Sequence, residues 1–234
     1  MPGVRGGMTT PEPIRVFIGY DKREAIAYHV CCQSLIEHSS LPLEIHPLAL
    51  NNMERFYEER HVDGSNAFIY SRFLVPYLCG WSGFALFLDG DMLVRGDVAD
   101  LWNRRRADKG VHVVKHDYRT KFPTKYLGNK NEDYPRKNWS SVMLWNCAYY
   151  PNRKLTPDFV ADASGRFLHR FEWLLDEQIE SLPKDWNHLT MEYAPDDAAK
   201  LFHYTVGTPC FPGYGEQEGA AEWFAACERA NAPL

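Results

Sequence analysis

The feature that most constrains the fold is an unbroken apolar run at 84–88 that stops at Asp89-Gly90-Asp91. A continuous run of this kind is typical of a central strand buried on both faces of a sheet. An earlier apolar run at 14–19 also ends at a glycine, and a helical pattern and a second strand at 43–45 follow it. This β-α-β order predicts an α/β domain with a mainly parallel sheet flanked by helices.

The helix after the first strand has a clear start and a clear buried face. Asp21 stands three residues before Glu24, which resembles a capping box. Apolar residues then recur at i, i+3, i+4 and i+8, at Ala27, Val30, Cys31 and Leu35. We expect further helices at about 67–78, 171–182 and 220–229, strands at 111–114 and 142–145, and a strand or loop at 198–204. The polar segment 115–137 lacks periodicity, so we expect it to be a lid or binding loop.

Length and charge limit the classes of protein that fit this chain. Its 234 residues predict a single domain at 14–234 behind a loose tail at 1–13. A net charge of -5 argues against nucleic acid as the main partner. Membrane insertion is not expected, because the chain has no apolar run of the roughly 18 residues that a spanning helix needs, and peripheral contact with a membrane stays open. Without a signal peptide, and with six cysteines that form no CxxC pair, we expect a cytoplasmic protein with reduced thiols.

Asp89-Gly90-Asp91 is the sharpest candidate site. Ligands of open α/β sheets bind beyond the carboxyl ends of the strands, where this motif lies. In extended backbone Asp89 and Asp91 project to the same side, and their mutual repulsion is relieved by a divalent cation such as Mg²⁺ or Mn²⁺. The alternative is an ordinary aspartate turn that caps the following helix.

The chain resembles the Asp-x-Asp glycosyltransferases of GT-A fold, most closely those of family 8. The segment Phe87 to Val94 contains the motif, and Tyr70-Ser71-Arg72 precedes it by about one strand. Later elements agree in order with the family: 138–146, 176–178, Leu182-Pro183, Trp186-Asn187 and Leu201-Phe202-His203-Tyr204.

The resemblance implies an enzyme with a UDP-sugar donor, a glycan or other hydroxyl acceptor and a bound Mn²⁺ or Mg²⁺. Metal ligands would be Asp89, Asp91 and His203, with a neutral imidazole at His203. Uracil would meet the turn Gly19-Tyr20-Asp21, where Asp21 can also be the helix cap. Arg72 would pair with an aspartate or a phosphate. The resemblance implies contacts with the donor at Gly19, Tyr20, Asp21, Arg72, Asp89, Asn138 and Gly207.

The chain departs from the family pattern at three places. The strand motif after Asn138 is one residue longer than Asn-x-Gly-Val. Thr208 stands where the family has a diphosphate-binding lysine. The diphosphate would then be neutralised by the metal, by backbone N–H groups around Gly207, or by another cation. The candidate cations are Lys200, Lys184 and Arg72. Glu177 stands where the family usually has glutamine.

Asp176 and Glu177 are the candidate catalytic residues. The family implies retention of the anomeric configuration, and a carboxylate at Glu177 could act as a nucleophile that stabilises oxocarbenium character. In the other interpretation Asp176 contacts a sugar hydroxyl and Glu177 only caps or solvates the helix. By association with such bacterial-looking chains, the expected acceptors are envelope saccharides.

Two other functions compete with the transferase. A haloacid-dehalogenase-like phosphohydrolase also places Asp-x-Asp after an apolar strand, and Asp89 would then be the nucleophile. Asp196-Asp197 could stand for its late acidic pair, although no strand precedes it. A non-catalytic carbohydrate-binding module would use the many tyrosines and tryptophans and would be indifferent to metal and nucleotide.

Overall fold

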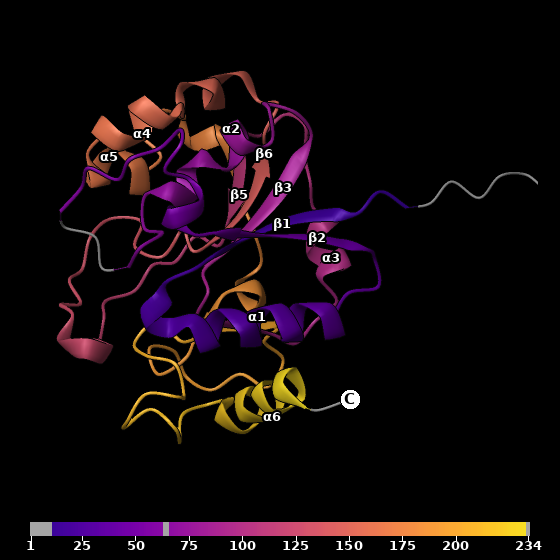
Figure 1. The fold of residues 1–234 in the computed structure, drawn as a ribbon, viewed down its shortest axis with the longest axis vertical. Coiled ribbons are helices and arrows are strands. Elements are labelled where there is room, and N and C mark those ends of the chain that lie inside the picture. The colour runs from indigo at the N-terminus through magenta and orange to yellow at the C-terminus, as the bar shows by residue number, and fades with distance from the viewer. Residues whose placement is uncertain (1–10, 63–65, 233–234) are drawn as a thin grey trace, which may run out of the picture.

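A six-stranded sheet forms the centre of the computed structural model, which describes residues 11–62 and 66–232 (Figure 1). The strands are β1 (Ile14–Gly19), β2 (Leu43–Leu48), β3 (Phe84–Leu88), β5 (Val111–Val113), β6 (Val142–Asn146) and β7 (Ile179–Ser181). Their order is β2-β1-β3-β6-β5-β7. Only β6 runs antiparallel to its neighbours in this sheet, so the expected mainly parallel α/β sheet is confirmed.

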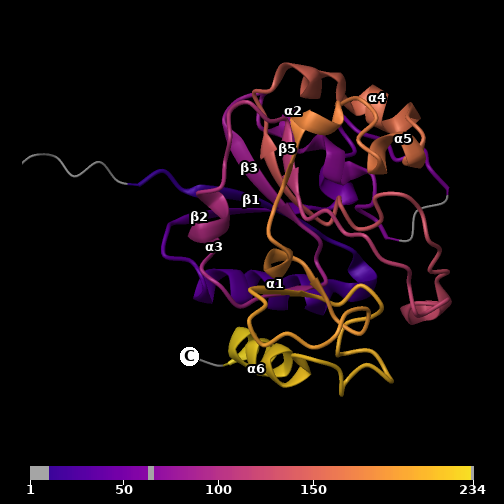
Figure 2. The same ribbon diagram turned by 180° about the vertical axis from the view of Figure 1, so that it is seen from behind.

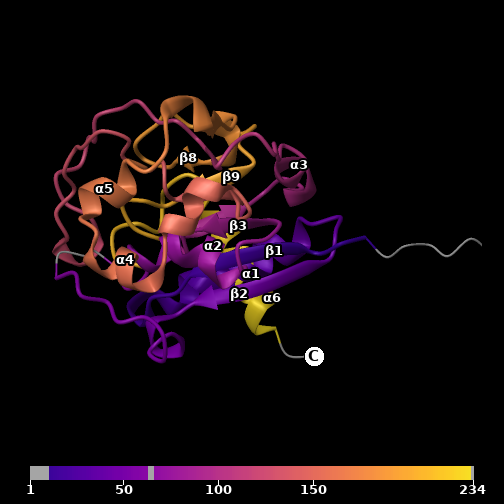
Figure 3. The ribbon, with the colours of Figure 1, turned by 90° about the horizontal axis from the view of Figure 1, so that it is seen from above.

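Helices cover both faces of the sheet (Figures 1 and 2). One face carries α1 (Ala25–Glu37), and α6 (Ala220–Asn231) packs on the outer side of α1. The other face carries α2 (Val75–Leu78), α4 (Pro157–Asp162) and α5 (Gly165–His169). Viewed from above, α4 and α5 lie at one end of the molecule and α3 (Val98–Trp102) lies at the other (Figure 3).

Alternating side chains of the central strands fill two separate cores. Leu86 and Leu88 of β3 pack in the core that includes Cys31 and Leu35 of α1. Phe87 packs in the opposite core, which includes residues of α4 and α5. Because successive side chains of a strand point to opposite faces, a strand covered on both faces must be apolar throughout. The continuous run at 84–88 was therefore interpreted correctly.

A small second sheet connects the end of β3 with a distant part of the chain. It consists of β4 (Met92–Val94), β8 (His188–Leu189) and β9 (Leu201–His203), in the order β4-β9-β8. β4 runs antiparallel to β9, and Met92 lies opposite His203. This register brings His203 beside the residues that directly precede Met92.

The sequence predicted the first helix correctly and two others wrongly. Asp21 caps the 3-10 turn that leads into α1, and all four predicted residues of the apolar face are buried. The segment 67–78 is not one helix: it forms a 3-10 turn at Ser71–Leu74 followed by α2, with Pro76 in the first turn of α2. The segment 171–182 forms a 3-10 turn and β7, because its residues pair with β5 and because Phe171 has a φ of 54°.

The polar segment 115–137 is irregular, as expected, apart from a 3-10 turn at Tyr126–Gly128. Its backbone is held by a bridge between Thr124 and Lys130 and by a hydrogen bond from the Tyr126 N–H to the Val206 carbonyl. The phenol of Tyr126 donates a hydrogen bond to Glu24, at the start of α1. This segment thus covers the carboxyl end of the sheet. None of the helices within 11–62 and 66–232 is long and apolar enough to cross a membrane. All six cysteines are free.

Candidate active site

Asp89, Gly90 and Asp91 connect β3 to β4 through a tightly packed turn. The Asp89 N–H donates to the Ser141 carbonyl at 3.0 Å, and the Tyr204 N–H donates to the Asp91 carbonyl at 3.0 Å. A Cβ at position 90 would lie 2.4 Å from the backbone oxygen of Gly19, so only glycine fits there. The backbone thereby fixes the two carboxylates at the edge where β1 and β3 end.

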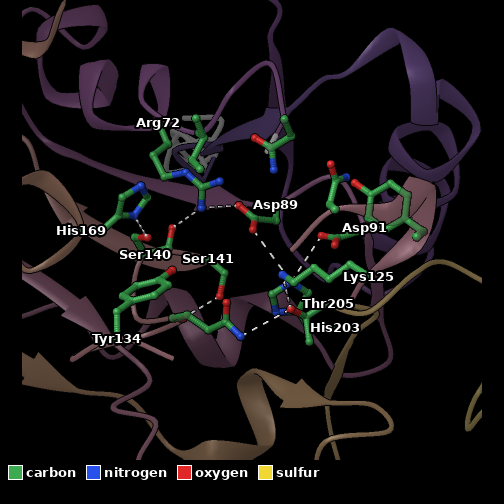
Figure 4. A pocket seen from close by; sticks show the side chains of 15 residues that line it. Arg72, Asp89, Asp91, Lys125, Tyr134, Ser140, Ser141, His169, His203 and Thr205 are labelled. Carbon is green, nitrogen blue, oxygen red and sulfur yellow. Dashed lines mark hydrogen bonds and ion pairs between the residues drawn. The ribbon is translucent and has the colours of Figure 1, made fainter. Parts of the chain in front are cut away.

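His203 meets both carboxylates (Figure 4). Its Nε2 lies 3.4 Å from Oδ1 of Asp91 and 3.8 Å from Oδ2 of Asp89. One ligand atom from each of these three residues falls within 4.8 Å of the others. An octahedral Mg²⁺ or Mn²⁺ with metal–ligand distances of about 2.1 Å has neighbouring ligands roughly 3 Å apart, so these spacings suit such an ion.

The imidazole of His203 is oriented by Asn187. Its Nδ1 lies 3.0 Å from Oδ1 of Asn187, whose amide nitrogen donates to the Ser141 hydroxyl at 2.8 Å. Since the amide nitrogen of Asn187 is used in that bond, its oxygen must accept a hydrogen bond from the Nδ1–H of His203. With a proton on Nδ1, the lone pair of a neutral imidazole would lie on Nε2, the atom that faces Asp89 and Asp91. A partner that orients a histidine in this way is typical of metal sites in proteins.

Charge in the site is unevenly compensated. Arg72 lies 2.7 Å from Oδ1 of Asp89 and donates to the Ser140 carbonyl at 2.9 Å. Burial nevertheless raises the pKa of Asp89 to about 6, and the neighbouring Asp91 adds to this rise. Burial also acts to raise the pKa of Asp91, but its interactions with His203 and Lys125 lower that pKa overall.

The donor set fits a hard divalent cation. Two carboxylates and one imidazole converge, and Oδ1 of Asp91 is buried without a hydrogen-bond donor among the described residues. Mg²⁺ and Mn²⁺ prefer oxygen ligands and accept an imidazole nitrogen, and three protein ligands leave positions open for substrate oxygens. The residues present therefore fit the ion that the motif predicts.

A cavity of about 60 Å³ lies over the cluster, and Lys125 forms part of its wall. The Lys125 ammonium lies 3.2 Å from the Thr205 hydroxyl. Burial lowers the pKa of Lys125, while the charges of Asp91 and Asp89 oppose that shift. Sequence reasoning missed Lys125, and the only available signal was a lysine in a loop that was already expected to be a lid.

The cations proposed from the sequence occupy other places. Lys200 lies 3.7 Å from Asp100 and 3.8 Å from Asp185, away from the cavity wall, and Lys184 does not line that cavity either. Thr208 is fully buried and contacts the sulfur of Cys210. The Gly207 N–H donates to the Tyr204 carbonyl within a turn. Of the candidates named for the diphosphate, Arg72 is the one that reaches the cavity.

The turn predicted to meet the base is already well bonded. Asp21 is buried and accepts from the Arg23 and Ala67 N–H groups and from the Arg23 guanidinium, with 2.6 Å between Arg23 Nη2 and Asp21 Oδ2. Burial opposes ionisation of Asp21, but these hydrogen bonds lower its pKa overall. Tyr20 packs edge-on against Tyr28, and Gly19 packs under the ring of Phe68. The capping role of Asp21 is confirmed, and its contact with a base stays a prediction.

Asn138 lies beside the cluster. It lines the same small cavity, and its amide donates to the Tyr118 hydroxyl at 2.8 Å. Its φ of 61° belongs to the left-handed region, which asparagine tolerates better than most residues. The extra residue between Asn138 and Val142 is thus accommodated by a tight turn that still directs Asn138 toward the site.

Asp176 and Glu177 lie apart from the cluster. Both are exposed and precede β7, whose first residue, Ile179, is level with Val111 and with Trp145 of β6. Asp89 instead follows Leu88, which pairs with Val142 at the other end of β6. Neither residue lines the cavity over the cluster, and Asp176 forms an ion pair with Arg136. The structure therefore does not bring this pair to Asp89, and their catalytic role stays a prediction without a supporting contact.

The phosphohydrolase alternative is not favoured by this geometry. Its late acidic pair would have to approach Asp89, but Asp196 and Asp197 are exposed, and the Asp196 N–H is bound by Glu218. Asp89 is held by Arg72 and faces His203.

Solved structures with a similar fold are glycosyltransferases of GT-A type. The bifunctional glycosyltransferase WbbM has a TM-score of 0.67 at 15% identity over 94% of this chain, and GlyE of Streptococcus pneumoniae TIGR4 has a TM-score of 0.61 at 14% identity over 92%. This chain spans 50% of the WbbM chain and 60% of the GlyE chain. Galactosyltransferase LgtC, solved with donor and acceptor sugar analogs, has a TM-score of 0.57 at 12% identity over 94% of this chain and 98% of its own. These similarities confirm the expected GT-A fold.

No protein-family model matches the chain. Among curated proteins, Protein CDI of Arabidopsis thaliana is 39% identical over 233 residues, which cover 96% of this chain and 90% of the plant protein. A relative in a plant gives no support to the bacterial origin that the sequence suggested. At this identity and coverage, the chain belongs to the same family as Protein CDI of Arabidopsis thaliana.

Proposed function

We propose that the chain is a metal-dependent glycosyltransferase that moves a sugar from a UDP-sugar to a hydroxyl acceptor with retention, in the manner of family 8. The observation that carries the proposal is the convergence of Asp89, Asp91 and His203 at the end of β3 in a GT-A fold. Mn²⁺ or Mg²⁺ is the proposed cofactor. We also propose that the protein acts in the cytoplasm.

The chain's own residues account for several demands of this reaction. The bond between the anomeric carbon and the diphosphate breaks with its electron pair leaving on the phosphate, so negative charge develops there. Asp89, Asp91 and His203 would hold a divalent ion, which supplies Lewis-acid stabilisation of that charge. Lys125, directed into the same cavity, would add a second positive charge and take the place of the lysine absent at Thr208.

Binding of a nucleotide requires Tyr126 and the turn that contains it to move from their present position. A cavity of about 60 Å³ holds an ion and a little water, and the hollow lined by Gly19, Asp21 and Glu24 is about 10 Å³. Lys125 and Tyr126 line the larger of these two spaces, and Tyr126 also donates a hydrogen bond to Glu24, which lines the smaller one. We infer that the Tyr126–Glu24 hydrogen bond breaks when the donor enters, which would make this turn a lid.

Calorimetric titration with UDP, in the presence and absence of Mn²⁺, tests the proposal directly. We expect UDP binding that depends on Mn²⁺ and is lost in Asp91→Ala, while the exposed Asp108→Ala behaves as wild type. Release of UDP from a panel of UDP-sugars then identifies the donor. Unchanged UDP affinity in Asp91→Ala with Mn²⁺ present would refute the proposed site, and hydrolysis of a generic aryl phosphate would support the phosphohydrolase.

A further inference from the structure

A second, much larger cavity adjoins the one over the carboxylate cluster. Its volume is about 670 Å³, within the range of roughly 300–1,000 Å³ that small-molecule sites occupy. It lies between α5 and the segment 130–137, and it shares Lys125, Tyr134 and His169 with the smaller cavity. In Figure 4, Tyr134 and His169 lie on one side of Asp89, and Asp91 lies on its other side. A molecule in the larger cavity would therefore border the donor site.

The wall of this cavity is strongly positive. Among the described residues it contains five cationic side chains and one carboxylate, Glu132; the cations are Lys125, Lys130, Lys137, Arg166 and Arg170. The whole chain carries a net charge of -5, so this concentration of positive charge is local. A cavity with such a wall raises the local concentration of anionic ligands.

These cations differ in the hydrogen bonds and ion pairs that they already form with the protein. Lys137 is buried and donates to Oδ1 of Asn131 at 2.7 Å, and Arg166 lies 3.4 Å from Glu172. The guanidinium of Arg170 makes no ion pair with any described residue, although the Arg170 carbonyl accepts a hydrogen bond from Arg136. Lys130 likewise makes no ion pair with any described residue, so Arg170 and Lys130 are the cavity cations whose charges are most available to a ligand. Of the two, Arg170 has the planar group that can bind a carboxylate or a phosphate through two hydrogen bonds.

The remaining wall offers surfaces that suit a sugar. The exposed Tyr134 presents an aromatic ring, and Ile69 adds apolar surface. His169 lies at the border of the two cavities, with its Nδ1 2.8 Å from the Ser140 hydroxyl and its Nε2 buried without a partner. Burial lowers the pKa of His169 to about 3, so the imidazole is neutral and can form a hydrogen bond with an acceptor hydroxyl.

We propose that this cavity is the acceptor site and that it selects an acceptor with a negatively charged group, a carboxylate or a phosphate. The inference rests on the proposed glycosyltransferase function. In the transfer, the acceptor oxygen bonds to the anomeric carbon, the bond from that carbon to the diphosphate breaks, and the hydroxyl proton passes to the leaving phosphate oxygen. Arg170 would hold the anionic group of the acceptor and so determine specificity.

The test measures binding of matched probes to the full chain, without nucleotide, by ligand-observed NMR titration. The probes are methyl glucuronide, glucose 6-phosphate, uncharged methyl glucoside and inorganic phosphate. We expect at least one charged sugar to bind about 10-fold or more tightly than methyl glucoside, and Arg170→Gln to remove that preference. Arg104→Gln changes an exposed arginine that follows α3 and does not line the cavity, so it should leave the preference unchanged. Figure 3 shows α3 at the opposite end of the molecule from α5.

The outcomes separate this inference from the proposed function. Preference for glucuronide identifies a carboxylate acceptor, and preference for glucose 6-phosphate identifies a phosphorylated one. Equal binding of all three sugars, an unchanged preference in Arg170→Gln, or inorganic phosphate that binds as tightly as glucose 6-phosphate would overturn the assignment. Failure of Mn²⁺-dependent UDP binding would instead refute the donor site, and it is measured without any acceptor probe.

Discussion

The Nδ1 atom of His203 lies 3.0 Å from Oδ1 of Asn187, and this contact decides which nitrogen of the imidazole faces the two carboxylates. Asn187 is fully buried, and its amide is fixed in turn by the Ser141 hydroxyl. Ser141 also binds the Asp89 N–H through its carbonyl. One short network therefore holds both the histidine and the first aspartate of the cluster.

The first prediction concerns this network. Asn187→Ala removes the acceptor for Nδ1, so the imidazole can rotate or change its protonated nitrogen, and we expect Mn²⁺ affinity to fall about 10–100-fold. Isothermal titration with Mn²⁺ measures the change. Asn103→Ala, at an exposed asparagine that ends α3, is the control and should bind Mn²⁺ as wild type. Wild-type affinity in Asn187→Ala would show that the network does not orient the ligand.

Residues 84–91 could be predicted from the sequence because their signal is local. A strand buried on both faces has to be apolar, and a turn with no room for a Cβ has to use glycine. The apolar run at 84–88 and Gly90 can therefore be recognised in the sequence. The same holds for α1, whose face and cap lie within a few turns. His203 was found only through resemblance, because its place depends on the pairing of β4 with β9.

Other parts of the site depend on tertiary contacts that leave no periodic pattern. Lys125 stands in an irregular segment, and nothing in its neighbours along the chain shows that it faces Asp91. The segment 171–182 has helix-like spacing, but pairing of Ile179 with Val111 makes part of it an edge strand. The short helices α4 and α5, begun by Thr156 and Ser164, were not predicted, and α5 contributes His169 and one wall of the larger cavity.

The second prediction concerns the buried ion pair of Arg72 and Asp89. Both residues are largely shielded from water, with 4% and 7% of their surfaces exposed. Arg72→Met leaves the carboxylate of Asp89 buried without its cation, which we expect to lower the free energy of unfolding by about 3–5 kcal/mol. Chemical denaturation measures this change at pH 7 without metal.

The double variant Arg72→Met, Asp89→Leu is the matched control for that experiment. Replacement of both charges by apolar groups leaves no uncompensated charge, so we expect it to recover much of the lost stability. If the double variant were as unstable as Arg72→Met, the loss of stability would come instead from the packing of the arginine against Phe68 and Phe87.

The third prediction concerns the contact between α1 and α6. The Arg229 guanidinium meets both carboxylate oxygens of Glu37 at 2.6 and 2.7 Å, and this hydrogen bonding lowers the pKa of Glu37 to about 2. A lowered folded-state pKa stabilises the protein above the ordinary value of about 4.5, and this stabilisation is lost as pH falls toward 2. Because Arg229 is half exposed, solvent screening keeps the contribution of this ion pair to the free energy of unfolding small.

Glu37→Gln tests that expectation through the pH dependence of unfolding. The variant should be less stable than wild type at pH 7, and the difference should shrink steadily between pH 4.5 and pH 2. High salt should also reduce the difference at pH 7, since the pair is partly exposed. A difference that is the same at pH 7 and pH 2 would mean that Glu37 stabilises the helix contact by its shape and not by its charge.

The fourth prediction concerns Lys125 as the cation for the diphosphate. Loss of one hydrogen bond to a charged group costs about 1.5–3 kcal/mol, so we expect Lys125→Gln to weaken Mn²⁺-dependent UDP binding by roughly 10–150-fold. Binding of uridine, which lacks the diphosphate, should not change. Lys200→Gln is the control, because Lys200 lies near Asp100 and Asp185 and not in the cavity wall.

Comparison of UDP with uridine separates the charge of Lys125 from its place in the segment that covers the site. If Lys125→Gln weakened both ligands equally, the lysine would act by holding the segment 115–137 in position, through its contact with Thr205. If Lys200→Gln alone weakened UDP binding, the diphosphate would lie on the side of Asp185. Lys125 would then not take the role of the family lysine that is absent at position 208. Selective loss of UDP in Lys125→Gln is the result that the geometry predicts, because its ammonium is directed toward the carboxylates that would hold the metal (Figure 4).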